Sequence, residues 1–186
     1  MRLLMVSALS YALLCGCGRA QQISINTVDT LKKEDPEAVL VPESVKKYLE
    51  EKFNGWELAE MGDYSSLWWS FYDKTHIPYA VSADFNDDQA ADYALITKKA
   101  DSVKLIVLTG NGTGFRDWGS KDFILDDKAG GIRHGLAVVP PGQIDVLRPK
   151  VKSLILKSNG LALYELESRR KIFYLDNESL KIFEGE

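Results

Sequence analysis

The sequence predicts an α+β fold that is mainly antiparallel β-sheet, with one amphipathic helix near the start of the folded domain. From Trp56 onward, short apolar or alternating runs recur between turn residues, which is typical of β-strands. Only one segment shows helical spacing of apolar residues. Because no helix alternates with the strand-like runs, a parallel α/β sheet is not expected.

The predicted helix covers residues 43–53. Val45, Leu49 and Phe53 fall on one face at helical spacing, and Pro42 suits the first turn. The pair Asn54-Gly55 is a typical stop signal. We interpret the segment as a helix packed on its own sheet, with a partner-binding helix as the alternative.

The predicted strands are short and form eight runs. Ser158-Asn159-Gly160 and Asp176-Asn177-Glu178 have the composition of tight hairpin turns and separate the last four runs. The runs cover residues 79–83, 93–97, 103–109, 136–139, 153–156, 161–166, 172–175 and 180–183.

The N-terminus has the features of an export signal. Arg2 precedes an apolar run over residues 3–14, which is the length of a signal-peptide core and too short for a membrane-spanning helix. We therefore predict a signal peptide over residues 1–16. Ordinary cleavage after Ala20 is the alternative.

The end of this leader, Leu13-Leu14-Cys15-Gly16-Cys17, resembles the lipobox of bacterial lipoproteins. The resemblance implies that Cys17 becomes a lipidated N-terminus anchored in the membrane of the bacterial cell envelope. The absence of Asp at position 18 favours the outer membrane. We expect residues 17–41 to form a lipidated tether and residues 42–186 to form a single β-rich domain.

Composition excludes several classes of function. Both cysteines lie in the leader region, so the domain has neither a disulfide nor a cysteine-based catalytic or zinc site. The formal net charge of -4 does not favour a nucleic-acid partner.

An acidic segment over residues 84–92 carries the sharpest functional clue. Asp84, Asn86, Asp88 and Asp92 occupy positions 1, 3, 5 and 9 of this segment, which we call the acidic loop. Calcium prefers six to eight oxygen ligands, and in loops of this spacing the backbone carbonyl at position 7, here Ala90, supplies one. The crowded carboxylates would repel one another without a cation or water between them.

The order of strand, acidic loop, strand, strand and glycine-rich turn over residues 81–115 resembles one FG-GAP or VCBS-type repeat. The resemblance implies propeller-blade-like hairpins and a calcium ion held by Asp84, Asn86, Asp88, Ala90 and Asp92. It covers one repeat only. The sequence departs from the pattern at position 6, where Gln89 replaces the glycine of a left-handed turn.

Two other functional classes remain open. An exported hydrolase would use acidic residues in a deep cleft, and an interaction or inhibitor module would use an exposed aromatic segment near Trp68 to bind a protein or glycan. His76 and His134 lie in no metal-binding pattern. With no catalytic motif present, the sequence favours a binding or structural role over an enzyme.

Overall fold

The computed structural model describes residues 41–119, 124–125, 130–146, 151–166, 170–177 and 179–184. The predicted signal peptide, Cys17 and the tether up to residue 40 lie outside these residues. Val41 is only 1% exposed and belongs to the core, so the folded domain begins at least one residue before the predicted boundary. Antiparallel β-sheet dominates the described chain, as the sequence predicts.

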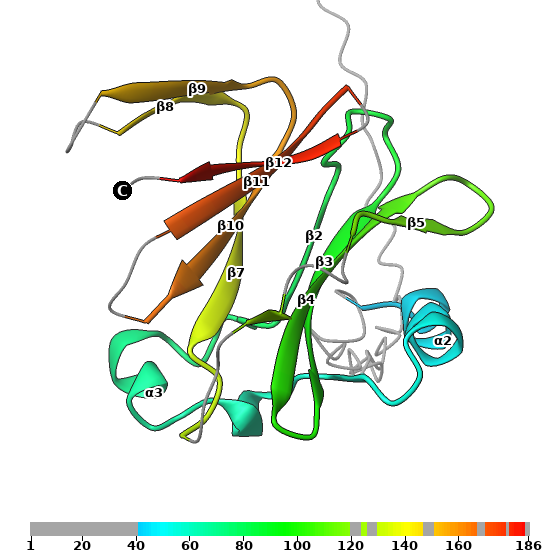
Figure 1. The fold of residues 1–186 in the computed structure, drawn as a ribbon, viewed down its shortest axis with the longest axis vertical. Helices are drawn as coiled ribbons and strands as arrows, with labels where there is room; N and C mark the ends of the chain where they lie inside the picture. The colour runs from blue at the N-terminus through cyan, green and yellow to red at the C-terminus, as the bar shows by residue number, and fades with distance from the viewer. Residues whose placement is uncertain are drawn as a thin grey trace, which may run out of the picture. The chain divides into compact units, whose positions relative to one another are not determined.

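Helix α2 (Glu43–Lys52) confirms the predicted amphipathic helix. Its buried face presents Val45 and Leu49 to the core, while the ring of Tyr48 meets Phe115 edge-on at 5.4 Å between centroids. The helix therefore packs beside the strands β4 and β5 (Figure 1). None of the helices in the described residues is long and apolar enough to cross a membrane.

The first sheet is built around two central strands, β3 (Asp92–Lys99) and β4 (Ser102–Gly110). Nearly every residue of both strands is buried, because their continuous apolar runs are covered on both faces. Four shorter strands complete the sheet: β1 (Glu57–Leu58) and β2 (Ala80–Ala83) pair with β3, and β5 (Phe115–Asp117) and β6 (Ile124–Leu125) pair with β4.

The second sheet has the order β12-β11-β10-β7 and is antiparallel throughout. It consists of β7 (His134–Val139), β10 (Gly160–Glu165), β11 (Arg170–Asp176) and β12 (Ser179–Glu184). The predicted turn after Asp176 is confirmed, since Asp176 pairs with Ser179 and Asn177 has a left-handed φ of 47°.

The predicted hairpin at Ser158-Asn159-Gly160 is wrong. Strand β9 (Lys152–Leu156) pairs with β8 (Gly142–Val146) in a separate two-stranded sheet, whereas β10 pairs with β7 and β11. The segment therefore leads from one sheet to another. The side chains of Ser158 and Asn159 bond to a distant loop, so their turn-like composition serves a tertiary contact.

The expectation of β-structure from Trp56 onward fails over residues 61–71. These residues form a 3-10 turn (Met61–Asp63) and the short helix α3 (Trp68–Phe71). The hydroxyl of Ser65 accepts a hydrogen bond from the Trp68 amide over 3.1 Å, which provides a helix start. Trp68 is therefore buried by packing from a helix instead of a strand.

The two sheets meet where β7 approaches β2. The amide of Leu136 donates to the carbonyl oxygen of Pro78 over 2.8 Å, just before β2 begins. Gly135 in β7 permits α3 to pack against the second sheet, because a Cβ atom there would lie 2.6 Å from the Trp68 ring and 2.8 Å from the Tyr164 ring. A single core of buried side chains therefore includes residues from both sheets and from both helices.

Candidate metal centre and neighbouring cavities

The acidic loop connects β2 to β3 and forms the tip of an antiparallel hairpin. Two of its residues, Asp87 and Gln89, have left-handed φ angles of 64° and 66°. Gln89 occupies position 6, where the sequence pattern predicts a backbone that favours glycine. The loop therefore takes the expected conformation although the glycine is absent, at a cost of about 1 kcal/mol.

The carboxylate of Asp84 is turned into the loop. Its Oδ1 atom accepts hydrogen bonds from the amides of Asp87 and Asp88 over 2.6 and 3.2 Å. Its Oδ2 atom accepts one from the amide of Gln89 over 2.8 Å. The Asp84 carboxylate thus accepts hydrogen bonds from three consecutive backbone amides of the loop.

Asn86 and Asp88 are joined to each other within the same loop. The Asn86 amide donates to Oδ2 of Asp88 over 2.8 Å, and the Asp88 backbone amide donates to Oδ1 of Asn86 over 3.1 Å. The other Asp88 oxygen accepts the backbone amide of Ala90 over 2.8 Å. The polar groups at positions 1, 3 and 5 therefore bond inside the loop.

Asp92 is fully buried and joins the loop to the end of β4. Its two oxygens accept the amides of Phe85 and Gly110 over 2.7 and 2.9 Å. Burial raises the pKa of the Asp92 carboxyl to about 6, although the two amide bonds oppose this rise, and the charges of Asp88 and Asp84 raise the pKa further.

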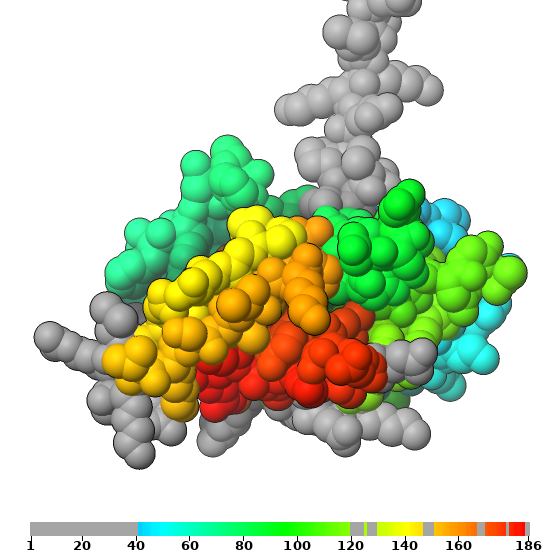
Figure 2. Space-filling view, turned by 90° about the horizontal axis from the view of Figure 1, so that it is seen from above, coloured from blue at the N-terminus to red at the C-terminus, as the bar shows by residue number. Residues whose placement is uncertain are grey.

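The loop is also fastened from the second half of the chain. The Ser158 hydroxyl donates a hydrogen bond to the carbonyl oxygen of Phe85 over 2.7 Å. The side-chain amide of Asn159 donates one to the carbonyl oxygen of Asp84 over 2.9 Å. Figure 2 shows the green surface of the loop region beside the orange surface of the segment that follows β9. Sequence reasoning missed this anchor because it pairs residues far apart in the chain.

These oxygens have the chemical character that calcium prefers, and a carboxylate oxygen that accepts one hydrogen bond keeps a further lone pair. Across the described ranges, however, no group of three or more His, Cys, Asp or Glu side chains is already placed to hold a metal ion. Binding would therefore use the Asn86 oxygen and the Ala90 carbonyl as well.

A polar cavity of about 490 Å³ adjoins the acidic loop. Asn86 and Asp88 form one wall, and Arg116 and Trp118 form another, with the guanidinium carbon of Arg116 4.0 Å from the centre of the Trp118 ring. We call this space the polar cavity. Strand β5, which carries Arg116 and is followed by Trp118, was not predicted, because it is short and lacks an apolar run.

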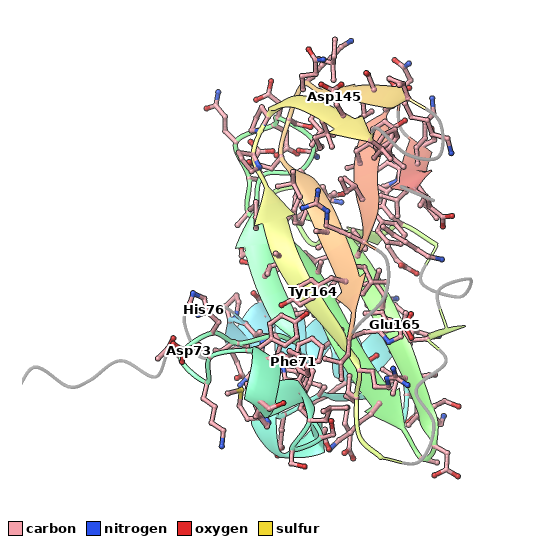
Figure 3. The ribbon with its side chains drawn as sticks, turned by 90° about the vertical axis from the view of Figure 1, so that its left-hand side faces the viewer. Phe71, Asp73, His76, Asp145, Tyr164 and Glu165 are labelled. Atoms are coloured by element: carbon pink, nitrogen blue, oxygen red, sulfur yellow. The ribbon has the colours of Figure 1, made fainter. Side chains whose placement is uncertain are left out.

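A second space of about 560 Å³ lies between α3, β2, β7 and β10, and is lined mainly by aromatic and aliphatic side chains. Its aromatic residues come from α3 and β10, and Figure 3 shows the labelled Phe71, Asp73, His76 and Tyr164 gathered on this face. Burial raises the pKa of the Tyr164 hydroxyl, with a further contribution from Tyr72.

Trp68 does not offer the exposed surface that an interaction module would need. Its side chain is 0% exposed, and within the described part of the chain its indole N–H has no hydrogen-bond partner. Leu67 and Phe71 beside it are 50% and 61% exposed. The buried tryptophan supports the interpretation of this segment as core.

The hydrolase alternative gains nothing from the geometry of the loop. Asp87 and Asp88 are exposed at the hairpin tip, and Asp92, whose pKa is raised, is sealed against backbone amides instead of facing a cleft. His76 is exposed, and His134 is buried in β7.

No protein-family model matches the chain. No curated protein and no solved structure matches it either.

Proposed function

We propose that the protein is a lipid-anchored binding protein of the bacterial cell envelope, and that calcium binding orders its acidic loop. The observation that carries this proposal is the inward orientation of the loop oxygens. Asp84 accepts three backbone amides, and Asn86 and Asp88 bond to each other. A hard divalent cation bound among these oxygens would relieve the repulsion between the carboxylates.

The anchoring of the loop gives the same proposal a second support. Because Ser158 and Asn159 hold the backbone at Phe85 and Asp84, the loop does not depend on a cation to keep its place in the fold. A site whose backbone is already ordered loses less conformational entropy on binding. Calcium would then act mainly on the exposed tip at Asp87 and Asp88.

The resemblance to an FG-GAP or VCBS-type repeat belongs to this proposal. Strands β2, β3, β4 and β5 pair in succession as a four-stranded antiparallel meander, the layout of one propeller blade. The acidic loop joins the first two strands, and the turn between Gly110 and Phe115 joins the last two. These two connections support the proposed resemblance.

A calcium titration of the full-length protein tests the metal proposal. We expect calcium to raise the melting temperature by about 5–10 °C at a hundredfold excess over the dissociation constant, and magnesium to raise it less. Asp88→Asn removes one charge from a proposed ligand and should weaken calcium binding about tenfold or more.

Asp87→Asn is the matched control for this variant. It removes the same charge from the same loop at a position outside the proposed ligand set, and asparagine tolerates the left-handed backbone found there. If both variants lose calcium affinity equally, diffuse charge and not coordination is responsible. If calcium leaves the melting temperature of the unaltered protein unchanged, the metal proposal fails.

Lipid attachment has its own test. When the full-length chain is produced in a bacterium fed a labelled fatty acid, we expect label on the protein and its loss in Cys17→Ser. Cys15→Ser is the matched control and should keep the label, because position 15 is the tolerant position of the lipobox. Retention of label in Cys17→Ser would overturn the anchor proposal.

A further inference from the structure

We propose that the polar cavity binds a neutral carbohydrate. The inference rests on the proposed function in one respect, because Asn86 and Asp88 line the cavity and also belong to the proposed calcium site. It goes beyond that function by assigning a ligand class to a space that the metal proposal leaves without a role.

The chemistry of the lining matches a sugar ring. Three asparagines reach the cavity from separate parts of the fold: Asn86 from the acidic loop, Asn111 from the turn after β4, and Asn177 from the turn between β11 and β12. Each side-chain amide both donates and accepts, as each sugar hydroxyl does. Thr109 adds a hydroxyl to the same lining.

Arg116 and Trp118 give the cavity a rigid wall. The guanidinium carbon of Arg116 lies 4.0 Å from the centre of the Trp118 ring. The indole N–H of Trp118 donates to the hydroxyl of Thr109 over 2.8 Å and fixes the ring in its plane. Flat groups held in this way offer the contact area that sugar rings use, at a low cost in side-chain entropy.

The charge of the surroundings selects against an anionic ligand. The four carboxylates of the acidic loop outweigh the charge of one bound divalent cation, so the loop stays negative even when calcium is present. On the cavity wall itself, Asp88 and Arg116 carry opposite charges. A neutral ligand that forms many hydrogen bonds suits this environment better than an acidic sugar or a phosphate.

The two sites share a wall, and this predicts coupling between them. A calcium ion that fixes Asn86 and Asp88 would also fix the part of the cavity wall that these two residues form. Binding of a sugar should then be tighter in the presence of calcium, and calcium should bind more tightly in the presence of the sugar, since coupling between sites is reciprocal.

The experiment is a calorimetric titration of the full-length protein with neutral oligosaccharides, with calcium and with chelator. Cellotetraose, maltotetraose and chitotetraose serve as probes, and the detergent must have no sugar head group. We expect at least one probe to bind at micromolar to millimolar concentration. Arg116→Ala and Trp118→Phe should each weaken that binding about tenfold.

Arg170→Ala is the matched control, because Arg170 is an exposed arginine on β11 and does not line the cavity. Binding that survives both cavity variants unchanged would place the sugar elsewhere and overturn the inference. Absence of binding by all three probes to protein that responds to calcium would overturn it while leaving the calcium proposal intact. Binding that the cavity variants weaken but that is equal with calcium and chelator would support the carbohydrate site and count against the calcium site.

Discussion

The side-chain amide of Asn159 donates a hydrogen bond to the main-chain oxygen of Asp84 over 2.9 Å, although 75 residues separate the two in sequence. The bond ties the start of the acidic loop to the segment that enters the second sheet. The conformation of the loop is therefore a property of the whole fold and not of the hairpin alone.

Removal of this anchor should loosen the loop. We expect Asn159→Ala to lower the free energy of unfolding by about 1 kcal/mol, because a half-buried carbonyl oxygen loses its donor. Calcium affinity should fall as well, since the loop must then be ordered by the ion. Urea unfolding with and without calcium measures both effects. The exposed Asn54→Ala is the control, and an equal calcium affinity in Asn159→Ala would show that the anchor does not support the metal site.

Protonation of Asp92 should give the calcium-free protein an unusual response to pH. Burial raises the pKa of this carboxyl to about 6, above its unfolded value of 3.8. Between these two values the folded state binds more protons than the unfolded state, so this group makes folding more favourable as the pH falls. The stabilisation that the protonated Asp92 carboxyl gives to the folded state is lost as the pH rises through 6.

The measurement compares the unaltered protein with Asp92→Asn in chelator. As the pH falls from neutral to about 4, the free energy of unfolding of the unaltered protein should rise by about 2 kcal/mol relative to that of Asp92→Asn. Carboxylates far from Asp92 titrate equally in both proteins and cancel in this difference. A difference that stays constant over the range would mean that Asp92 keeps an ordinary pKa.

Gln89→Gly should stabilise the protein. The residue has a φ of 66°, which is strained for any residue with a Cβ atom and free for glycine. We expect a gain of about 0.5–1 kcal/mol in the free energy of unfolding. Gln143→Gly makes the same chemical change on β8, where the backbone does not have a positive φ, and should destabilise. Equal losses in both variants would show that the loop bears no strain at position 6.

Gly135→Ala should disturb the packing of α3 against the second sheet. The added methyl group would lie 2.6 Å from the Trp68 ring, with a second close contact to Tyr164. We expect a loss of about 1–3 kcal/mol and a changed tryptophan emission spectrum. Gly62→Ala is the control, since nothing lies within 4 Å of the position its methyl group would take. An unchanged emission spectrum in Gly135→Ala would mean that Trp68 does not pack as described.

The strands that the sequence predicts best are those with the most apolar residues. Strands β3 and β4 stand out because continuous burial requires a continuous apolar run. The pattern gives no comparable signal for β8, whose exposed Gln143 and Asp145 pair with Ile155 and Ser153 of β9. The pairing of β9 was also mistaken, because turn-forming residues at Ser158-Asn159 are read locally while their partners lie near residue 85.

The candidate site likewise contains one part that the sequence predicts and one part that it does not. Spacing identified the acidic loop, and the resemblance to an FG-GAP or VCBS-type repeat implied a left-handed residue at its sixth position, since both depend on near neighbours. The polar cavity could not be anticipated, because Asn86, Arg116 and Asn177 meet only when the acidic loop, β5 and the turn after β11 are brought together by the two sheets. Short-range patterns predict loops, but the spaces between loops depend on topology.

The β8–β9 hairpin has a consequence for how the molecule opens. Among the described strands these two pair only with each other, and Ile155 is 71% exposed on their surface. A two-stranded ribbon with so little covered surface is marginally stable by itself. Its amide hydrogens should exchange with solvent well before those of β3, through local fluctuations that leave the rest of the protein folded. The ribbon would then be the part of the chain most easily reshaped by a neighbouring surface.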